Sequence, residues 1–585
     1  MKEKNNAINQ VQQLATTQFS VGACADAIAK ELKDWQVKNK VQLLWEHDAT
    51  LWTDSDESKW MGWLDIASEQ SEIPRIVALA NEINVAGYTD IVLLGMGGSS
   101  LCPAMLADTF GKIENYPRLH ILDSTDPMQI RHLEEKINLK KTFFLVSSKS
   151  GSTLEPNIFK DYFYTQLQTV LNKKEVGDRF IAITDPGTTL ETIAKKDSFK
   201  AIFYGVPSIG GRYSDLSNFG MVPAGLMGID VKEFMLHAEA MRKNCSPSVL
   251  VQDNPGVVLG VILGVCANQG KDKITLIVSP DIHSLGAWLE QLLAESTGKN
   301  GKGLIPVDQE PLGVVNVYGD DRVFVYIRLD AAPDAEQDHA VHELEKAGFV
   351  VVRLNFADKM HLGAELFRWE IATDVAGSII GINPFNQPDV EDSKLLTAQL
   401  TDQYEKTGKL IQSRAFFSAD GISLFSDESN ENDIAELLIG EPSIEGYLQA
   451  HLNRVKKDDY VDLSAFIEMS NEHTNLLQES RVLIRDRKKV ATCLGFGPRF
   501  LHSTGQAYKG GPNTGVFLQI TADYVDDIQV PGHRYTFGIV ISAQAQGDFT
   551  VLAKRARRVL RIDLGSDVLG GLQQLRKYFD ASLKP

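Results

Sequence analysis

The segment Phe143-Phe-Leu-Val-Ser-Ser-Lys-Ser-Gly-Ser-Thr-Leu-Glu-Pro-Asn157 combines an apolar run, a polar loop and the start of a helix. The apolar run predicts a buried strand, and Pro156 is well tolerated in the first turn of a helix. Backbone N–H groups at a helix start, the loop hydroxyls and the charge of Lys149 together suit a dianion. A capped turn without any ligand has the same composition, so this loop leaves both interpretations open.

A second loop of the same kind lies upstream. Asp90 begins an apolar run that predicts a strand, and Gly95-Met-Gly-Gly-Ser-Ser100 leads into a predicted helix. Loops that follow parallel strands can meet on one ligand at the same edge of a sheet. The rival is a dinucleotide site, because the loop begins the G-x-G-x-x-G fingerprint and Asp123 ends the next predicted strand. Ser100 replaces the third glycine, which favours a compact phosphate monoester.

Composition limits the partners and the compartment. The 585 residues predict two or three domains, and the formal net charge of −18 argues against nucleic acid and anionic membranes as partners. The five cysteines include no C-x-x-C pair, as expected of a reduced cytoplasmic protein, and we see no signal peptide. The longest apolar run, residues 257–267, is too short to span a bilayer and predicts a buried helix or a pair of strands.

Alternating strands and helices predict two doubly wound α/β domains with mostly parallel sheets. The first set of expected strands covers 90–95, 118–123, 142–147, 179–184 and 200–204, and the second set begins at Ile274, Asp321 and Gly348. Residues 1–60 predict polar and amphipathic helices, and two further strands are expected at 489–495 and 535–541. The predicted domains are a helical arm (1–72), a first α/β domain (73–245) and a second with a C-terminal extension (246–585).

Arg212 and Glu295 are the charged residues best suited to chemistry. Arg212 follows two glycines that allow close approach of a ligand, and its guanidinium suits an oxyanion, although a surface ion pair explains it equally. Glu295 lies one turn after Gln291 on a predicted helix that Gly298 ends, beside a basic, glycine-rich loop. It is either a general base or an ordinary helical glutamate.

Other candidates follow later in the chain. Gln387 and Lys394 lie two turns apart on one face of a predicted helix that begins at Pro388. His502 follows a predicted strand in a loop of Ser, Thr and Gly, where an acid–base residue is often found. His339 and His342 have the spacing of metal ligands, but they lie on a polar helix with no obvious third ligand, so we do not predict a metal site.

These motifs together resemble the glucose-6-phosphate isomerase family, whose members are built from two sugar-isomerase (SIS) domains. The resemblance is carried by Gly95-Met-Gly-Gly-Ser, Ser148-Lys-Ser-Gly-Ser-Thr, Gly210-Gly-Arg-Tyr-Ser, Glu295-Ser-Thr-Gly-Lys, Asn383-Pro-Phe-Asn-Gln and the block at His502. The spelling of the Glu295 and His502 blocks is similar to the isomerase half of bifunctional transaldolase/phosphoglucose isomerases. The chain shows nothing similar to the transaldolase half.

The resemblance implies a role for each candidate. The implied phosphate-binding residues are Gly97, Gly98, Ser99, Ser148, Ser150 and Thr153, with Lys149 nearby. Arg212 would stabilise an enediolate and Glu295 would move the proton between C2 and C1. Gln291 and Gln387 would line the site, and Lys394 and His502 would assist ring opening. The histidine block follows the glutamate and lysine blocks here, whereas it lies between them in the ordinary family.

The implied activity is the reversible isomerisation of glucose 6-phosphate and fructose 6-phosphate, without metal or other cofactor. The implied assembly is a homodimer in which His502 is donated across the interface, although the sequence alone also allows it to act in its own chain. Two alternatives stay open: a sugar-phosphate-binding regulator without catalysis, and an NAD-dependent dehydrogenase.

Overall fold

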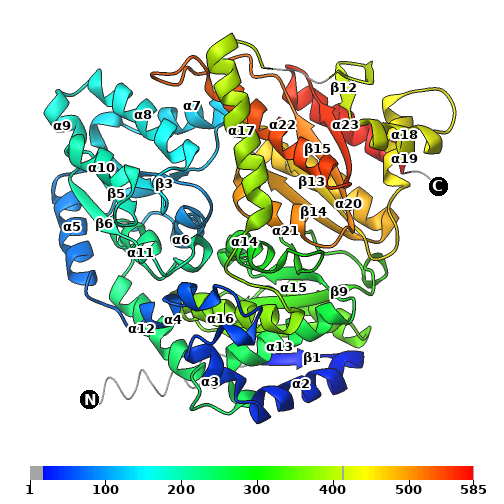
Figure 1. The fold of residues 1–585 in the computed structure, drawn as a ribbon, viewed down its shortest axis with the longest axis horizontal. Helices are drawn as coiled ribbons and strands as arrows, with labels where there is room; N and C mark the ends of the chain where they lie inside the picture. The colour runs from blue at the N-terminus through cyan, green and yellow to red at the C-terminus, as the bar shows by residue number, and fades with distance from the viewer. Residues whose placement is uncertain (1–16, 411–413, 584–585) are drawn as a thin grey trace. The chain divides into compact units, whose positions relative to one another are not determined.

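The computed structural model describes residues 17–410 and 414–583, apart from the side chains at 173 and 174. Many of its elements are labelled in Figure 1, where colour follows the chain. The chain forms two compact units, which are described one at a time. The first unit contains the chain up to Asp123, Leu133–Thr297 and Val323–Asn386, and the second contains Ser124–His132, Gly298–Arg322 and the chain from Gln387 onward. The helices expected within residues 1–16 lie outside the described residues, and the boundaries between the three predicted domains stay a prediction.

The first unit contains the first predicted parallel sheet. Its strands are β2 (Asp90–Leu94), β3 (Arg118–Leu122), β4 (Thr142–Ser147), β5 (Phe180–Thr184) and β6 (Ala201–Tyr204). They pair in parallel in the order β3-β2-β4-β5-β6, which confirms the five strands expected from the sequence. Because β2 and β4 are neighbours, with Leu94 opposite Val146, their two polar loops leave the sheet at the same edge.

A second sheet in this unit contains β7 (Lys273–Val278), β9 (Arg322–Leu329) and β10 (Val350–Phe356), as expected. It runs in the order β1-β10-β9-β7 within the unit. The edge strand β1 (Thr17–Ser20) was not expected, since the sequence analysis assigned only helices to the first sixty residues. Its four residues are held by antiparallel pairing with β10, a long-range contact that the local sequence does not reveal.

The helices of the first unit surround these sheets. They are α2 (Ala25–Val37), α3 (Lys40–Trp45), α4 (Trp63–Ile66), α5 (Ile73–Val85), α6 (Leu101–Phe110), α8 (Leu154–Gln168), α9 (Lys173–Gly177), α10 (Thr189–Lys196), α11 (Asn218–Leu226), α12 (Val231–Asn244), α13 (Pro255–Asn268), α14 (Leu285–Thr297), α15 (Ala335–Lys346) and α16 (Leu362–Ile380). The apolar run at 257–267 is therefore a buried helix, α13, with Asn254 capping its first turn. No helix among the described residues is both long and apolar enough to cross a membrane.

The second unit contains a third sheet, most of which the sequence analysis did not predict. Its strands are β11 (Phe417–Ala419), β12 (Ile422–Phe425), β13 (Tyr460–Ala465), β14 (Ala491–Phe496), β15 (Gly515–Thr521) and β16 (Arg558–Asp563), in the order β11-β12-β16-β15-β13-β14. The last four in this order are parallel. Strand β14 confirms the strand expected at 489–495, and His502 ends the short helix Arg499–His502 that follows it.

The other elements of this unit are helical apart from β8 (Ile305–Val307). They are α17 (Pro388–Thr407), α18 (Glu428–Leu437), α19 (Ile444–Leu452), α20 (Asn471–Lys488), α21 (Gly505–Gly510), α22 (Phe537–Lys554) and α23 (Val568–Ser582), while α7 (Pro127–Lys136) crosses into the first unit. The strand expected at 535–541 is wrong, because α22 begins there. The Thr536 side chain accepts a hydrogen bond from Ile539 N, which caps the helix, and the apolar residues are buried at helical spacing.

Candidate active site

The loop after β2 packs tightly against the loop that carries Arg212. A Cβ added to Gly98 would lie 2.1 Å from Gly211 O and 2.8 Å from Arg212 N, so only glycine fits at this position. Gly97 has a φ of 54°, which a side chain would disfavour. Ser99 is buried beside them. The glycines that the sequence suggested for phosphate binding therefore also hold the Arg212 loop in place.

The loop after β4 presents hydroxyl groups at the start of α8. The hydroxyls of Ser147 and Ser148 are buried, and neither has a hydrogen-bond partner in the part of the chain that the structure describes. Ser150 Oγ lies 3.3 Å from Thr153 Oγ1, and Thr153 stands at the N-cap of α8 without using its side chain to cap the helix. Buried hydroxyls and helix N–H groups at one loop suit an oxyanion.

Lys149 is turned to the neighbouring strand. Its ammonium group forms an ion pair with Asp185, just after β5, and donates to Val206 O at 3.2 Å. Its charge thus already has a counter-ion. In this structure Lys149 anchors the loop after β4, while the hydroxyls and backbone of the loop remain to meet an anion.

The Arg212 guanidinium is buried, with 3% of the residue exposed, and acceptors hold it on several sides. Nε donates to Ser296 Oγ at 2.7 Å, and Nη2 donates to the carbonyls of Pro384 and Asn386 at 2.5 and 3.2 Å. Nη1 lies 3.6 Å from Glu295 Oε1. A fixed cation therefore faces the carboxylate for which the resemblance implies the role of base.

Glu295 lies in the last turn of α14, where the structure confirms the predicted helix. Gln291 Nε2 donates to Glu295 Oε2 at 3.0 Å, as expected of residues one turn apart. The Glu295 side chain is 13% exposed, so it is largely desolvated but still reachable. A carboxylate oriented by an amide and an arginine can act as a base at a defined position.

Three further residues beside Arg212 were not predicted as site residues from the sequence: Tyr213, Ser296 and Asp374. Tyr213 donates to Asp374 Oδ1 at 2.6 Å and lies 3.2 Å from Ser296 Oγ, which accepts from Arg212. Burial raises the pKa of Asp374 well above its ordinary value, although the hydrogen bond from Tyr213 and the charge of Arg212 oppose this. Asp374 is one of three acids in α16, with Glu365 and Glu370, so the local sequence does not single it out, whereas Ser296 directly follows Glu295.

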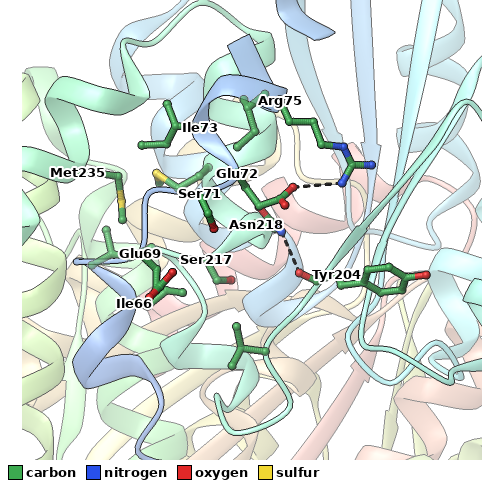
Figure 2. Close-up of a pocket in the computed structure, with 14 residues that line it drawn as sticks. Ile66, Glu69, Ser71, Glu72, Ile73, Arg75, Tyr204, Ser217, Asn218 and Met235 are labelled. Carbon is green, nitrogen blue, oxygen red and sulfur yellow. Dashed lines mark hydrogen bonds and ion pairs between the residues drawn. The ribbon is translucent and has the colours of Figure 1, made fainter. Parts of the chain in front are cut away.

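A separate cavity of about 210 Å³ lies in the same unit, lined by residues of α5 and by residues that follow β6 (Figure 2). Ile73 and Met235 belong to its apolar lining. Arg75 forms an ion pair with Glu72 at 3.1 Å, and Asn218 Nδ2 donates to Tyr204 O at 2.8 Å. The lining includes none of the predicted site residues, so this cavity is distinct from the candidate site.

Gln387, Lys394 and His502 belong to the second unit. Gln387 is the N-cap of α17, and Pro388 opens the helix as expected. The Lys394 side chain is 47% exposed and forms an ion pair with Glu391 at 2.8 Å. His502 is followed by α21, whose Gln506 donates to Gly298 O at 2.9 Å. The structure thus gathers the two polar loops, Arg212, Gln291 and Glu295 in the first unit and the other three candidates in the second.

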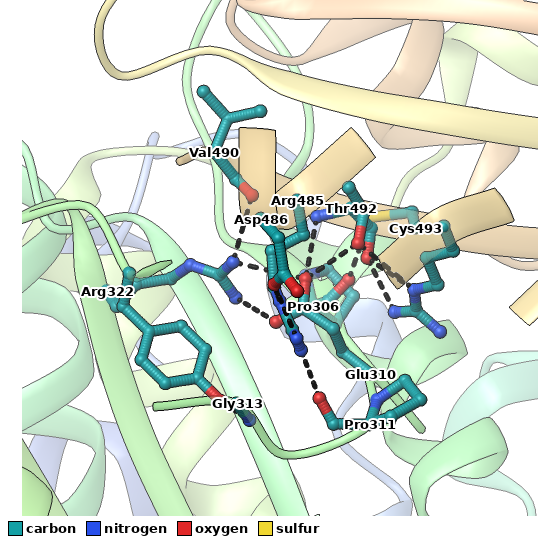
Figure 3. Close-up of polar contacts among 12 residues, drawn as sticks. Pro306, Glu310, Pro311, Gly313, Arg322, Arg485, Asp486, Val490, Thr492 and Cys493 are labelled. Carbon is teal, nitrogen blue, oxygen red and sulfur yellow. Dashed lines mark hydrogen bonds and ion pairs between the residues drawn. The ribbon is translucent and has the colours of Figure 1, made fainter. Parts of the chain in front are cut away.

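A buried ion pair fixes the segment after Gly298 on β14 (Figure 3). Glu310 binds both terminal nitrogens of Arg322, at 3.0 and 3.1 Å, and both side chains are inaccessible to solvent. Glu310 also accepts from Thr492 N and Oγ1 at 3.0 and 2.7 Å. Burial alone would raise the pKa of Glu310, but the charges of Arg322 and Arg481 and the hydrogen bonds lower it below its ordinary value. The carboxylate is therefore ionised in the folded protein.

Glu310→Gln should destabilise the protein by about 3–5 kcal/mol near neutral pH, because it leaves Arg322 buried without its counter-ion. Since folding lowers the pKa of Glu310, this stabilisation is present above the unfolded-state pKa and is lost as the pH falls through the folded-state pKa. Urea unfolding of both proteins from pH 7 to pH 3 should show the difference shrinking in acid. Glu343→Gln, which breaks the exposed pair with Lys346, is the control and should change little. A pH-independent difference would contradict this account.

Gly98→Ala should disrupt the site without touching a charged group, because the new Cβ overlaps the backbone that carries Arg212. We expect catalysis to fall by about a hundredfold, as displacement of a catalytic group commonly causes. Steady-state kinetics on the purified variant measure this. The loss should be far smaller for Gly211→Ala, whose Cβ would meet no atom within 4 Å. Equal losses in both variants would show that the packing of Gly98 is not what matters.

Comparison with known proteins shows which proteins this chain is similar to. The family model of phosphoglucose isomerase matches residues 82–310, which contain both polar loops, Arg212, Gln291 and Glu295. The chain is 28% identical to the probable glucose-6-phosphate isomerase of Methanococcus maripaludis over 55% of its own length and 83% of that protein. It is 27% identical to the glucose-6-phosphate isomerase of Parabacteroides distasonis over 61% and 90%.

Two solved structures share the fold. A hypothetical protein from Thermus thermophilus superposes with a TM-score of 0.58 at 21% identity, covering 66% of this chain and 99% of that one. A glucose-6-phosphate isomerase from Chlamydia trachomatis gives a TM-score of 0.57 at 19% identity, covering 66% and 88%. The chain therefore matches the phosphoglucose isomerase family model over residues 82–310 and is similar to glucose-6-phosphate isomerases over more than half of its length.

Proposed function

We propose that this protein interconverts glucose 6-phosphate and fructose 6-phosphate as an aldose–ketose isomerase. The observation that carries the proposal is the arrangement of Glu295, which Gln291 orients at 3.0 Å and which faces the buried Arg212 at 3.6 Å. One base and one fixed cation are what the transfer of a proton between neighbouring carbons requires. The similarity of the chain to proteins named glucose-6-phosphate isomerase supports the same activity.

The phosphate group of the substrate would bind at the shared edge of β2 and β4. The Ser148 hydroxyl, which is buried without a partner among the described residues, gains one when a phosphate oxygen arrives. Ser150, Thr153 and Ser99 would add hydroxyl donors, and the starts of α6 and α8 add backbone N–H groups. Gly97 and Gly98 would allow the loop backbone to approach the ligand.

Glu295 would move one proton between two carbons. In the open-chain aldose it removes the proton from C2, which leaves a cis-enediolate with its negative charge on O1. Arg212 would stabilise that charge. Return of the proton to C1, with transfer of the O2 proton to O1, gives the ketose. Gln291 and Gln387 would line the site. Because only protons move, the reaction consumes no oxidant and needs no metal.

Ring opening comes before this step, and we assign it to His502 and Lys394. A proton must leave the anomeric hydroxyl and another must reach the ring oxygen, so an acid–base residue is required. In the described structure Lys394 pairs with Glu391 at an exposed position, which leaves its ammonium group accessible to a substrate. A cytoplasmic location belongs to the same proposal, because the cysteines show no paired motif.

Glu295→Gln tests the activity and the identity of the base together. The wild-type protein should convert fructose 6-phosphate to glucose 6-phosphate in a coupled assay with EDTA present. The variant keeps the shape of the side chain but removes the proton acceptor, so isomerisation and exchange of the C2 hydrogen with solvent should both fall by several orders of magnitude. Inhibition by inorganic phosphate should persist, because the polar loops are intact. Retained C2 exchange would identify another base, and an inactive wild type would overturn the function.

We further propose a homodimer in which His502 is donated across the interface. The resemblance supports both the dimer and the donated histidine, and light scattering should then give about twice the 64.7 kDa mass of one chain.

Mixed dimers decide between the two arrangements. Glu295→Gln and His502→Ala chains with different affinity tags are refolded together, and dimers carrying both tags are isolated. With His502 acting in cis, every site keeps one lesion, so no activity should return. Donation across the interface would leave one of the two sites intact and restore about half of the wild-type activity per dimer. We expect this recovery. Absence of activity in verified mixed dimers would reject donation across the interface, and failure to find any dimer would reject the assembly.

A further inference from the structure

Gln506 joins three separate segments of the second unit. It is completely buried in α21. Its amide oxygen accepts from Asp389 N at 2.9 Å, and its Nε2 donates to Gly298 O at 2.9 Å and to Asp389 Oδ2 at 2.5 Å. One side chain thus satisfies a backbone donor, a backbone carbonyl and a carboxylate from distant parts of the chain.

Each of these segments adjoins a residue assigned to the reaction. Gln506 follows His502 by four residues, and Asp389 lies between Gln387 and Lys394. Gly298 begins the loop after the Glu295 helix. Building on the proposed isomerase function, we propose that Gln506 is a positioning residue that holds His502 and the start of α17 in the arrangement needed for ring opening.

The packing around Gln506 leaves little freedom for α21 to shift. A Cβ on Gly510 would lie 2.1 Å from Asp389 Oδ2 and 2.8 Å from Gly298 O, and Gly301 N donates to Gly510 O at 2.9 Å. Contacts at this range require that the three segments keep one relative position. Gln506 supplies the directional hydrogen bonds within this packing, because each of its polar atoms has a partner.

Two ion pairs connect α21 and the start of α17 to α22 and its C-cap residue. Lys509, also in α21, forms a buried ion pair with Asp548 of α22 at 2.6 Å. Arg555 forms an ion pair with Asp389. The carboxylate of Asp389 therefore receives an amide on one oxygen and a guanidinium on the other, which fixes the first turn of α17.

Glu295 has side-chain partners different from those of Gln506. Its partners Gln291 and Arg212 both belong to the first unit, whereas the partners of Gln506 belong to the second. Loss of the Gln506 amide should thus disturb ring opening much more than proton transfer. This separation gives a readout that general destabilisation does not imitate, because a partly unfolded enzyme loses both steps equally.

The test compares a cyclic substrate with one that cannot form a ring. In 5-deoxyfructose 6-phosphate the hydroxyl that closes the furanose ring is missing and O6 is esterified, so the sugar stays open. Gln506→Met keeps the volume of the side chain and removes its hydrogen bonds. We expect its kcat on fructose 6-phosphate to fall by about a hundredfold, as misplaced catalytic groups do, with a much smaller fall on the 5-deoxy sugar. KM and inhibition by inorganic phosphate should stay near the wild-type values.

Gln544→Met is the matched control. Gln544 is also a buried glutamine of the second unit, and its Oε1 accepts from Thr125 Oγ1 at 2.7 Å, away from the three segments. It should lower thermal stability without changing the ratio of the two activities. If Gln506→Met does not fold, Arg555→Met serves instead, since its side chain is 29% exposed and it removes the second partner of Asp389. Arg555→Met should shift the ratio in the same direction.

The possible results separate the inference from the function beneath it. A wild-type protein that fails to convert fructose 6-phosphate refutes the proposed function itself. An active wild type whose Gln506→Met variant loses both activities equally, or neither, leaves the function standing and overturns the role of Gln506. A selective loss on the cyclic sugar supports the proposal.

Discussion

The buried guanidinium of Arg212 is the constraint on which the first unit depends. A buried cation needs hydrogen-bond acceptors or a counter-ion, because otherwise the free-energy cost of removing it from water destabilises the fold. Here a serine hydroxyl from α14 and two carbonyls from the segment before α17 provide them, while Glu295 lies within ion-pair distance. The loop glycines are then required because the backbone bearing this arginine passes directly over the loop after β2. The geometry of the site therefore follows from the need to surround the Arg212 guanidinium with acceptors.

In the second unit, buried polar side chains with paired hydrogen-bonding groups also connect loops. Glu310 and Gln506 are fully or almost fully buried, and each is surrounded by groups from segments far apart in the chain. Buried polar networks of this kind are costly unless every member is paired, and when paired they specify a single arrangement. They allow polar, glycine-rich segments to be held as firmly as a helix, which is the condition for loops that carry catalytic groups.

What could be predicted from the sequence was local. The apolar run before Ser147, the loop hydroxyls, the helix that ends after Glu295 and the start of α17 at Pro388 are each encoded within a few residues, and each is observed. Strand β1 and most of the third sheet depend on partners far along the chain, and periodicity over short windows does not detect such pairing. The segment at Tyr535 was misassigned because an apolar run begins both strands and buried helices.

The candidate site residues differ in the same respect. Arg212, Gln291 and Glu295 could be proposed because their motifs are compact, and the structure brings the three residues together. Asp374 and Gln506 act at sequence distances of more than a hundred residues from their partners Tyr213 and Gly298, so nothing near them in the chain marks them. Lys149 has the sequence context of an anion-binding residue, but its ammonium group forms an ion pair with Asp185, which follows the neighbouring strand β5. The contacts of these three residues depend on the folded structure, so they could not be predicted from the neighbouring sequence.

Strand β1 also has a consequence for the behaviour of the protein in solution. It is short, it lies at the end of its sheet, and it covers the open side of β10 through pairs from Thr17 with Leu354 to Ser20 with Val351. The strand beneath it, Val350–Phe356, is rich in β-branched and aromatic residues. An uncovered strand of that composition is a template for other chains. The few residues of β1 therefore protect the protein against aggregation. A truncation or fusion that displaces them would remove few contacts, but it would expose β10 as an edge strand that can pair with other chains.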